Sequence, residues 1–161
     1  MRIIITGVPG TGKTCIAKKL GKKIKAKVIN ELEFARKKRI GKREGKERVI
    51  PLKQFEKSLN KEVKKFRNAI IEGHLLCEIK LKADKLILLR AKPEEIEKRL
   101  RKKGYKEEKI LDNVFCEETG YIKEKLLKNY PKNKIIEIKS EKNINNTLNN
   151  IIKKLKIEGI K

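Results

Sequence analysis

Short apolar runs alternate with segments of helical periodicity along most of the chain. Five runs have the length and Ile, Leu and Val content of buried strands: 2–6, 27–30, 69–73, 85–90 and 134–138. Between and after them, apolar residues recur three or four positions apart, which predicts helices at 15–24, 31–40, 52–66, 93–104, 106–129 and 143–157. Strands that alternate with helices predict an α/β fold, a doubly wound parallel sheet with helices on both faces.

One segment departs from this pattern. Residues 36–48 read RKKRIGKREGKER and hold eight basic residues in thirteen, with two glycines. Such a stretch is too polar for the core and too interrupted by glycine for a good helix. We expect an exposed, mobile segment that is a solvated loop, a clamp for a phosphate group or a contact for RNA.

Length and composition indicate one intracellular domain, residues 1–161. A chain of 161 residues buries one sizeable core without metal or disulfide support. Its three cysteines, Cys15, Cys77 and Cys116, have neither zinc-ligand nor disulfide-framework spacing. No signal-peptide pattern or membrane-span length of apolar residues is found, so we expect a cytoplasmic protein without a membrane segment.

The formal net charge is +24. A charge of this size in a small domain favours binding to a polyanion such as RNA, a ribosome or nucleotide phosphates. The chain is also rich throughout in Lys, Ile, Asn and Glu, a composition that general proteome bias produces as well. Both interpretations of the charge stay open.

The loop after the first strand carries the strongest chemical signal. Residues Gly7 to Thr14 read GVPGTGKT and match G-x-x-x-x-G-K-[ST] between a predicted strand and a predicted helix. In such a P-loop the glycines, here Gly7, Gly10 and Gly12, let backbone N–H groups point at a phosphate. Lys13 would reach the β and γ oxygens of ATP and Thr14 would hold Mg²⁺, and the next N–H, that of Cys15, would reach the α-phosphate.

The strand at 69–73 supplies two further candidates at its end. P-loop enzymes need a carboxylate at the end of a strand beside the loop, where it orients the metal and its waters, and Glu72 stands there. His74, the only histidine of the chain, follows two residues later. It is either a hydrogen-bonded residue at a strand boundary or a catalytic group that positions water or relays a proton near the γ-phosphate.

Three stretches together resemble a known family. GVPGTGKT, IIEGH at 70–74 and RLRKKGYKEEKILDNVFCE at 99–117 are similar to the adenylate kinase isoenzyme 6 (CINAP) family of adenylate-kinase-like ATPases, to which the archaeal putative adenylate kinases also belong. The resemblance implies a nucleoside monophosphate kinase fold with a five-stranded parallel core. It also implies an acceptor (AMP-binding) segment at about 30–50 and a short lid at about 101–111.

The same resemblance implies site residues and partners. Arg99 would stack on adenine, Lys103 would take the lid position that Arg usually holds, and Arg36 would grip the acceptor phosphate. Glu72 stands where the family has Asp, and the segment INELEFARKK lacks the G-D pair usual in nucleotide kinases. Proteins of this family act late in maturation of the small ribosomal subunit, so ribosomal protein uS11 and small-subunit rRNA are the partners that it implies.

Three functions are compatible with these residues. The first is an enzyme, an adenylate kinase that converts ATP and AMP, or another nucleoside monophosphate, with Mg²⁺ and also hydrolyses ATP. The second is a ribosome-assembly ATPase with little true kinase activity, in which His74 orients the attacking water. The third is a different small-molecule kinase of the same fold. The sequence leaves the acceptor, the balance of kinase and ATPase activity, and the oligomeric state open.

Overall fold

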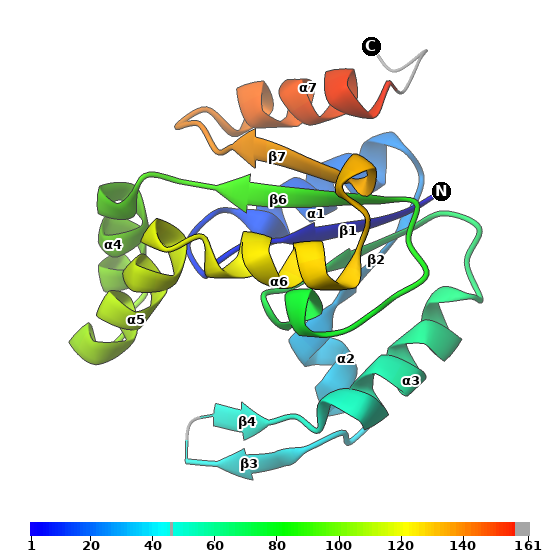
Figure 1. Ribbon diagram of the computed structural model, residues 1–161, viewed down its shortest axis with the longest axis horizontal. Helices are drawn as coiled ribbons and strands as arrows, with labels where there is room; N and C mark the ends of the chain where they lie inside the picture. The colour runs from blue at the N-terminus through cyan, green and yellow to red at the C-terminus, as the bar shows by residue number, and fades with distance from the viewer. Residues whose placement is uncertain (46, 157–161) are drawn as a thin grey trace.

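The computed structural model describes residues 1–45 and 47–156, and its centre is a five-stranded parallel sheet (Figure 1). The strand order is β2-β5-β1-β6-β7, and every neighbouring pair in this sheet is parallel. The strands are β1 Arg2–Thr6, β2 Lys27–Asn30, β5 Ala69–Glu72, β6 Lys85–Arg90 and β7 Ile135–Lys139. The predicted fold class is therefore confirmed, with each of the five predicted strands present to within one residue.

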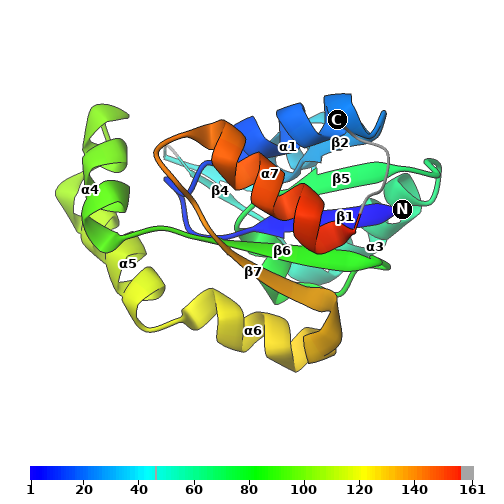
Figure 2. The same cartoon turned by 90° about the horizontal axis from the view of Figure 1, so that it is seen from above.

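Helices cover both faces of the sheet. Figure 2 shows α1 and α7 over one face, and Figure 1 shows α3 and α6 on the other side. The α-helices are α1 Lys13–Lys23, α2 Glu31–Lys37, α3 Leu52–Val63, α4 Pro93–Lys102, α5 Glu107–Glu118, α6 Tyr121–Asn129 and α7 Ile144–Leu155. Two short 3₁₀ helices, η1 Leu75–Glu78 and η2 Lys132–Lys134, follow β5 and precede β7.

The central strand β1 contributes to two hydrophobic clusters. Ile3 and Ile5 pack with the apolar faces of α1 and α7, whereas Ile4 packs with residues of α2, α3, α4 and α6. All three isoleucines are fully buried, because side chains alternate across a strand that is covered on both faces. This covered strand fixes the position of the loop that follows it.

The basic segment at 36–48 is more ordered than the sequence predicted. Its residues are largely exposed, as expected, but β3 Lys42–Glu44 and β4 Glu47–Val49 pair as an antiparallel hairpin. Arg48 holds the base of this hairpin, because its guanidinium donates to the backbone oxygens of Ile40 and Gly41, each at 2.8 Å. Lys46 lies outside the described residues. Apolar and polar residues do not alternate in this hairpin, which is held by backbone hydrogen bonds and the Arg48 contacts. The sequence pattern therefore did not predict its two strands.

The helical stretch predicted at 106–129 is two helices. It breaks between α5 and α6 at Gly120, which has φ +68°. The left-handed backbone suits glycine because other residues would place a Cβ too close to the carbonyl oxygen. The prediction of one continuous helix was wrong for this reason.

All five parallel strands end at one edge of the sheet. There the hairpin of β3 and β4 meets the segment from the end of α4 to the start of α5. The range 101–111, predicted as a lid, consists of the end of α4, a turn at Gly104 and the start of α5. The hairpin reaches this segment, because Glu47 of β4 pairs with Lys109 of α5. In the described part of the chain no helix is long and apolar enough to cross a membrane.

Candidate functional site

The loop Gly7–Thr14 connects buried β1 to α1 at the carboxyl edge of the sheet. Its turn is held from within, because Thr11 Oγ1 donates to the backbone oxygen of Val8 at 2.9 Å. Gly12 caps α1 with φ +93°, so the helix begins at Lys13. The first N–H groups of a helix have no intrahelical partner and carry the positive end of its dipole. The loop therefore presents backbone donors suited to a phosphate anion.

Lys13 is a buried cation at the start of this helix. The residue is 8% exposed, and Nζ donates to the backbone oxygen of Val8 at 2.9 Å. Burial lowers the pKa of Lys13 from its ordinary value to about 8, although the carboxylates of Glu31 and Glu72 oppose this shift. A positive charge that is shielded from water beside a phosphate-binding loop is well placed to neutralise phosphate oxygens.

Glu72 joins three elements at the sheet edge. Its Oε1 accepts from Thr14 Oγ1 at 3.0 Å and from Asn30 Nδ2 at 2.5 Å, so β5, α1 and β2 converge on one carboxylate. Glu72 is 2% exposed, whereas Thr14 is exposed. A hydroxyl and a carboxylate supply oxygen ligands of the kind that Mg²⁺ prefers. An ion held by these two alone keeps its other coordination positions open for waters and phosphate oxygens. The structure thus brings together two residues that the sequence proposed for the metal.

His74 follows β5 and lies against a carboxylate that the sequence analysis missed. The backbone N–H of His74 donates to Glu31 Oε1 at 2.8 Å, and the same oxygen lies 3.0 Å from His74 Nδ1. Glu31 is the first residue of α2 and is 1% exposed. A glutamate directly after a predicted strand was the available signal, because the ends of parallel strands meet at one edge. The sequence analysis missed Glu31 because only the apolar positions of the helix predicted at 31–40 were considered.

The first of two cavities at the P-loop has a volume of about 460 Å³ and lies between the loop and α4. Arg99 and Lys103, both predicted to contact the nucleotide, line it together with Gly10 and Gly12. The guanidinium of Arg99 donates to the backbone oxygen of Gly10 at 2.9 Å. The opposite wall comes from the segment between β7 and α7, which the sequence analysis did not identify: Ser140, Glu141, Lys142 and Ile144.

The second cavity has a volume of about 240 Å³ and lies on the other flank of the same loop. Val8 and Pro9 of the loop line it, together with His74 and residues from η1, α5 and α6. Cys77 is among them, and burial raises the pKa of its thiol to about 12, which keeps it in the unreactive thiol form. The P-loop therefore separates two cavities, one lined by Arg99 and one by His74.

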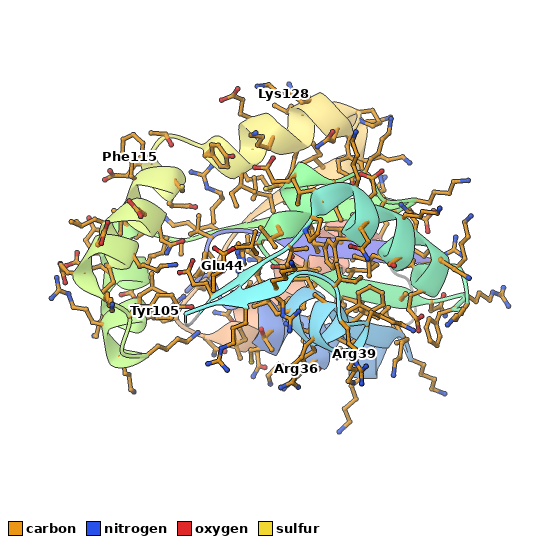
Figure 3. All side chains as sticks on the ribbon, turned by 90° about the horizontal axis from the view of Figure 1, so that it is seen from below. Arg36, Arg39, Glu44, Tyr105, Phe115 and Lys128 are labelled. Atoms are coloured by element: carbon orange, nitrogen blue, oxygen red, sulfur yellow. The ribbon has the colours of Figure 1, made fainter. Side chains whose placement is uncertain are left out.

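Several predicted residues line neither cavity: Gly7, Lys13, Thr14 and Cys15 of the P-loop and the start of α1, Glu72 at the end of β5, and Arg36 of α2. Arg36 is exposed on α2 (Figure 3), and it is not a lining residue of either cavity. Cys15 is exposed in the first turn of α1, directly after Thr14. Its backbone N–H belongs to the helix start that the sequence assigned to phosphate binding, while its thiol has no defined role there.

Comparison with known sequences finds a matching family model and relatives that share one name. The AAA domain family model matches residues 3–120. A protein of Pyrococcus furiosus named "putative adenylate kinase" is 40% identical over 117 residues, which are 73% of this chain and 63% of that protein. A protein of Methanocaldococcus jannaschii with the same name is 38% identical over 120 residues, 73% of this chain and 67% of its own length. The chain thus matches about two thirds of the length of these relatives.

Comparison with solved structures gives the fold. Shikimate kinase from Bacteroides thetaiotaomicron matches with a TM-score of 0.66 at 16% identity, covering 98% of this chain and 99% of that one. Deoxyadenosine kinase from M. mycoides with bound dATP matches with a TM-score of 0.61 at 17% identity, covering 97% and 100%. Both are kinases, and at this identity they establish the shared architecture alone. With its P-loop at the end of β1 and the family model matched over residues 3–120, this chain belongs to the AAA domain family, and the archaeal proteins named "putative adenylate kinase" are its relatives.

Proposed function

We propose that this protein is an adenylate-kinase-like phosphotransferase that moves the γ-phosphoryl group of ATP to AMP or a similar nucleoside monophosphate, yielding ADP. One observation carries the proposal: a single P-loop separates two cavities at the carboxyl edge of the sheet. A kinase must hold a donor and an acceptor on opposite sides of the phosphoryl group that moves between them. An enzyme that only hydrolyses ATP needs the donor site but no acceptor site.

The donor nucleotide would occupy the larger cavity and the P-loop. Arg99, fixed by its bond to Gly10, offers a planar cation against which adenine can stack. Lys103, at the end of α4, would approach the phosphates from the lid side with a point charge. The phosphates themselves would lie on the loop and the first turn of α1, contacting Gly7, Gly10, Gly12, Lys13, Thr14 and Cys15.

Thr14 and Glu72 would hold Mg²⁺, Thr14 through its hydroxyl and Glu72 through a water molecule. The ion supplies charge neutralisation for the phosphate oxygens when it is bound. Asn30 keeps the Glu72 carboxylate in place through its amide N–H, and Lys13 neutralises the same oxygens from the loop side. Positioning and charge, rather than covalent chemistry, are what this arrangement contributes to phosphoryl transfer.

The acceptor would occupy the smaller cavity beside His74. The segment 30–50 and the lid 101–111 would then close over the reacting groups, and the Glu47–Lys109 pair already joins them. Arg36 reaches the acceptor phosphate only if α2 and the hairpin move, since Arg36 is exposed and does not line the smaller cavity. Closure of two such segments also excludes water from the transferring group.

A panel of acceptors tests this proposal. ATP with Mg²⁺ is supplied with AMP, CMP, UMP, GMP, deoxyadenosine or shikimate, and ADP formation is measured against ATP alone. We expect ADP formation to rise most with AMP. A larger response to deoxyadenosine or shikimate would replace the proposal with a different small-molecule kinase of the same fold. No response to any acceptor, with hydrolysis intact, would leave an ATPase.

A second function is favoured by the hairpin. Most of the described basic residues of the segment 36–48 are exposed, among them Lys42 and Arg43 of the hairpin, and the chain carries a net charge of +24. We propose on this basis a role in cytoplasmic maturation of the small ribosomal subunit, with small-subunit rRNA and ribosomal protein uS11 as partners. ATP turnover would then drive a conformational change on the subunit, and His74 would orient the attacking water.

Charge removal at the hairpin tests the RNA contact. Lys37, Lys38, Lys42 and Lys46 are replaced by Gln together, and the control replaces four exposed lysines of α1, β7 and α7: Lys18, Lys22, Lys139 and Lys153. We expect the first variant to bind ATP normally and to bind small-subunit RNA more weakly, with a salt slope that is shallower by roughly one for each RNA phosphate no longer neutralised. Equal weakening in both variants would mean that the net charge, not the hairpin, attracts RNA.

A further inference from the structure

Glu31 occupies a buried position between two strand ends. It follows β2 directly, and the register of β2 against β5 pairs Asn30 with Glu72. Glu31 therefore lies alongside the segment 73–75, where the chain leaves β5. At 1% exposure, its carboxylate needs hydrogen-bond partners to offset the loss of water.

The hydrogen-bond partners of Glu31 come from the exit of β5. Its Oε1 accepts from the backbone N–H of His74 at 2.8 Å, and its Oε2 accepts from that of Leu75 at 3.0 Å. A further contact is to the imidazole, with Nδ1 of His74 at 3.0 Å from Oε1. An ionised carboxylate only accepts hydrogen bonds, so the Nδ1 atom must carry the proton of a neutral ring.

Gly73 makes this approach possible. A Cβ at position 73 would overlap the carboxyl group of Glu31, so any other residue there would displace the carboxylate from His74. The requirement concerns space and not the backbone angle. Glu31 and Gly73 therefore act as one arrangement, in which an absent side chain gives room for a buried one.

The orientation of His74 has a chemical consequence. With Nδ1 bound to Glu31, the nitrogen that remains for another group is Nε2, which then carries the lone pair. The imidazole is 40% exposed and lines the smaller cavity beside Val8 and Pro9 of the P-loop. An acceptor nitrogen at this place can receive a hydrogen bond from a water or a hydroxyl group.

We propose that Glu31 is a positioning residue for His74, which fixes the Nδ1–H tautomer and leaves Nε2 as a hydrogen-bond acceptor facing the smaller cavity. The catalytic consequence rests on the proposed function, because it assumes that this cavity receives the reacting group. The tautomer itself does not depend on any activity. Carboxylates that orient a histidine in this way act through the ring and not on the substrate.

A competing explanation is that Glu31 only stabilises the backbone. Its bonds to the N–H groups of His74 and Leu75 would satisfy donors at the start of η1 whether or not the ring is involved. A backbone role predicts loss of stability on substitution. It predicts no preference between the two ring nitrogens of His74.

Nitrogen NMR of the imidazole separates these explanations. His74 is the only histidine, so the ¹⁵N-labelled protein gives one set of ring signals. At a pH at which the ring is neutral, we expect the Nδ1–H tautomer to predominate in the unchanged protein. A ring protonated mainly on Nε2 would overturn the proposal without any variant being made.

Substitutions sharpen the test. Glu31→Ala should shift the ring toward the Nε2–H tautomer, whereas Glu31→Gln retains a carbonyl oxygen and should largely keep the Nδ1–H form. Glu33→Ala is the matched control, because Glu33 is exposed in the same turn of α2. An unchanged tautomer in Glu31→Ala would contradict the proposal. If that variant does not fold, the unchanged protein and Glu31→Gln still provide the comparison.

ATP turnover measures the consequence for catalysis. Glu31→Ala should lower turnover about tenfold when His74 is present and should have little further effect in the His74→Ala background. Losses that multiply independently would show that Glu31 does not act through His74. If the wild-type protein shows the Nδ1–H tautomer but does not turn over ATP, the proposed function is contradicted and the positioning role of Glu31 is not.

Discussion

The two flanks of the P-loop differ in how their residues are held. On the donor flank, Lys13 and Glu72 are buried and Arg99 is bonded to the loop backbone. On the proposed acceptor flank, His74 lines the smaller cavity, whereas Arg36 and most of the hairpin are exposed and lie outside it. The hairpin meets the predicted lid through the surface pair Glu47–Lys109. Buried polar contacts fix geometry, whereas exposed charges permit movement and weaker, adaptable binding. If the proposed function is correct, the donor site is the part held by buried polar contacts, and the acceptor segment is the part that exposed charges leave adaptable.

Removing the P-loop cation should have the largest effect. Lys13→Ala takes away the buried ammonium beside the loop, so we expect ATP turnover to fall by about 10²–10³-fold. The change also removes a desolvated charge, so the variant should stay folded, which a thermal melt would check. Lys18→Ala, an exposed lysine of the same helix, should turn over ATP normally. Similar rates for Lys13→Ala and Lys18→Ala would mean that the loop is not the catalytic site.

The Glu72 carboxylate should come next. Glu72→Gln keeps the size and the Asn30 neighbour but loses the charge, so we expect roughly 10–100-fold lower turnover at low Mg²⁺, partly recovered at high Mg²⁺. Glu72→Asp should retain more activity. Turnover measured against Mg²⁺ concentration would reveal this difference, and identical Mg²⁺ curves for all three proteins would exclude Glu72 from the metal site.

The pH dependence of ATP binding follows from the pKa of Lys13. In the free protein this pKa is lowered to about 8, mainly by burial, and bound phosphates favour the charged form. Binding therefore takes up a proton above pH 8, and we expect ATP affinity to fall about tenfold per pH unit there. Lys13→Arg, which stays charged, should lose this dependence. A flat affinity between pH 7 and 9.5 in the unchanged protein would contradict the expectation.

The same shift affects stability with a defined sign. The unfolded chain keeps Lys13 protonated up to its ordinary pKa of 10.5, while the folded chain releases the proton near 8. The unfolded state thus binds more protons between these values, so the contribution of Lys13 to the free energy of unfolding rises with pH across that window. Lys13→Arg should show no such rise in denaturant titrations at pH 8 and 10.

The acceptor flank should respond least. Arg36 is exposed, and exposed ion pairs contribute little, so Arg36→Ala should raise the KM for AMP by about fivefold and leave the KM for ATP unchanged. Arg39→Ala, also exposed next to α2, serves as the control. A loss for Arg36 as large as for Lys13 would show that the acceptor segment closes tightly, and it would remove the contrast between the two flanks.

What the sequence predicted follows the same division. The motif GVPGTGKT, the five strands and the position of Glu72 could be predicted because strand ends and fixed spacings determine where they lie. Arg99 and Lys103 came from the family resemblance instead, and both line the larger cavity, while their contacts with a nucleotide stay a prediction. The hairpin was missed because its strands are short, exposed and held by backbone bonds and Arg48. The place of Glu31 directly after a predicted strand was a signal for the sheet edge, but its contact with His74 depends on the space left by Gly73, which is distant in the sequence. Contacts between distant residues carry no local signal.

The fate of the γ-phosphoryl group tests the central claim most directly. The protein is incubated with ATP labelled at the γ position and Mg²⁺, with and without AMP, and the labelled products are separated. We expect most of the label to appear in ADP when AMP is present, with slow release of inorganic phosphate when it is absent. Label found only in inorganic phosphate, at a rate that AMP does not change, would contradict phosphoryl transfer and leave ATP hydrolysis as the activity of this site.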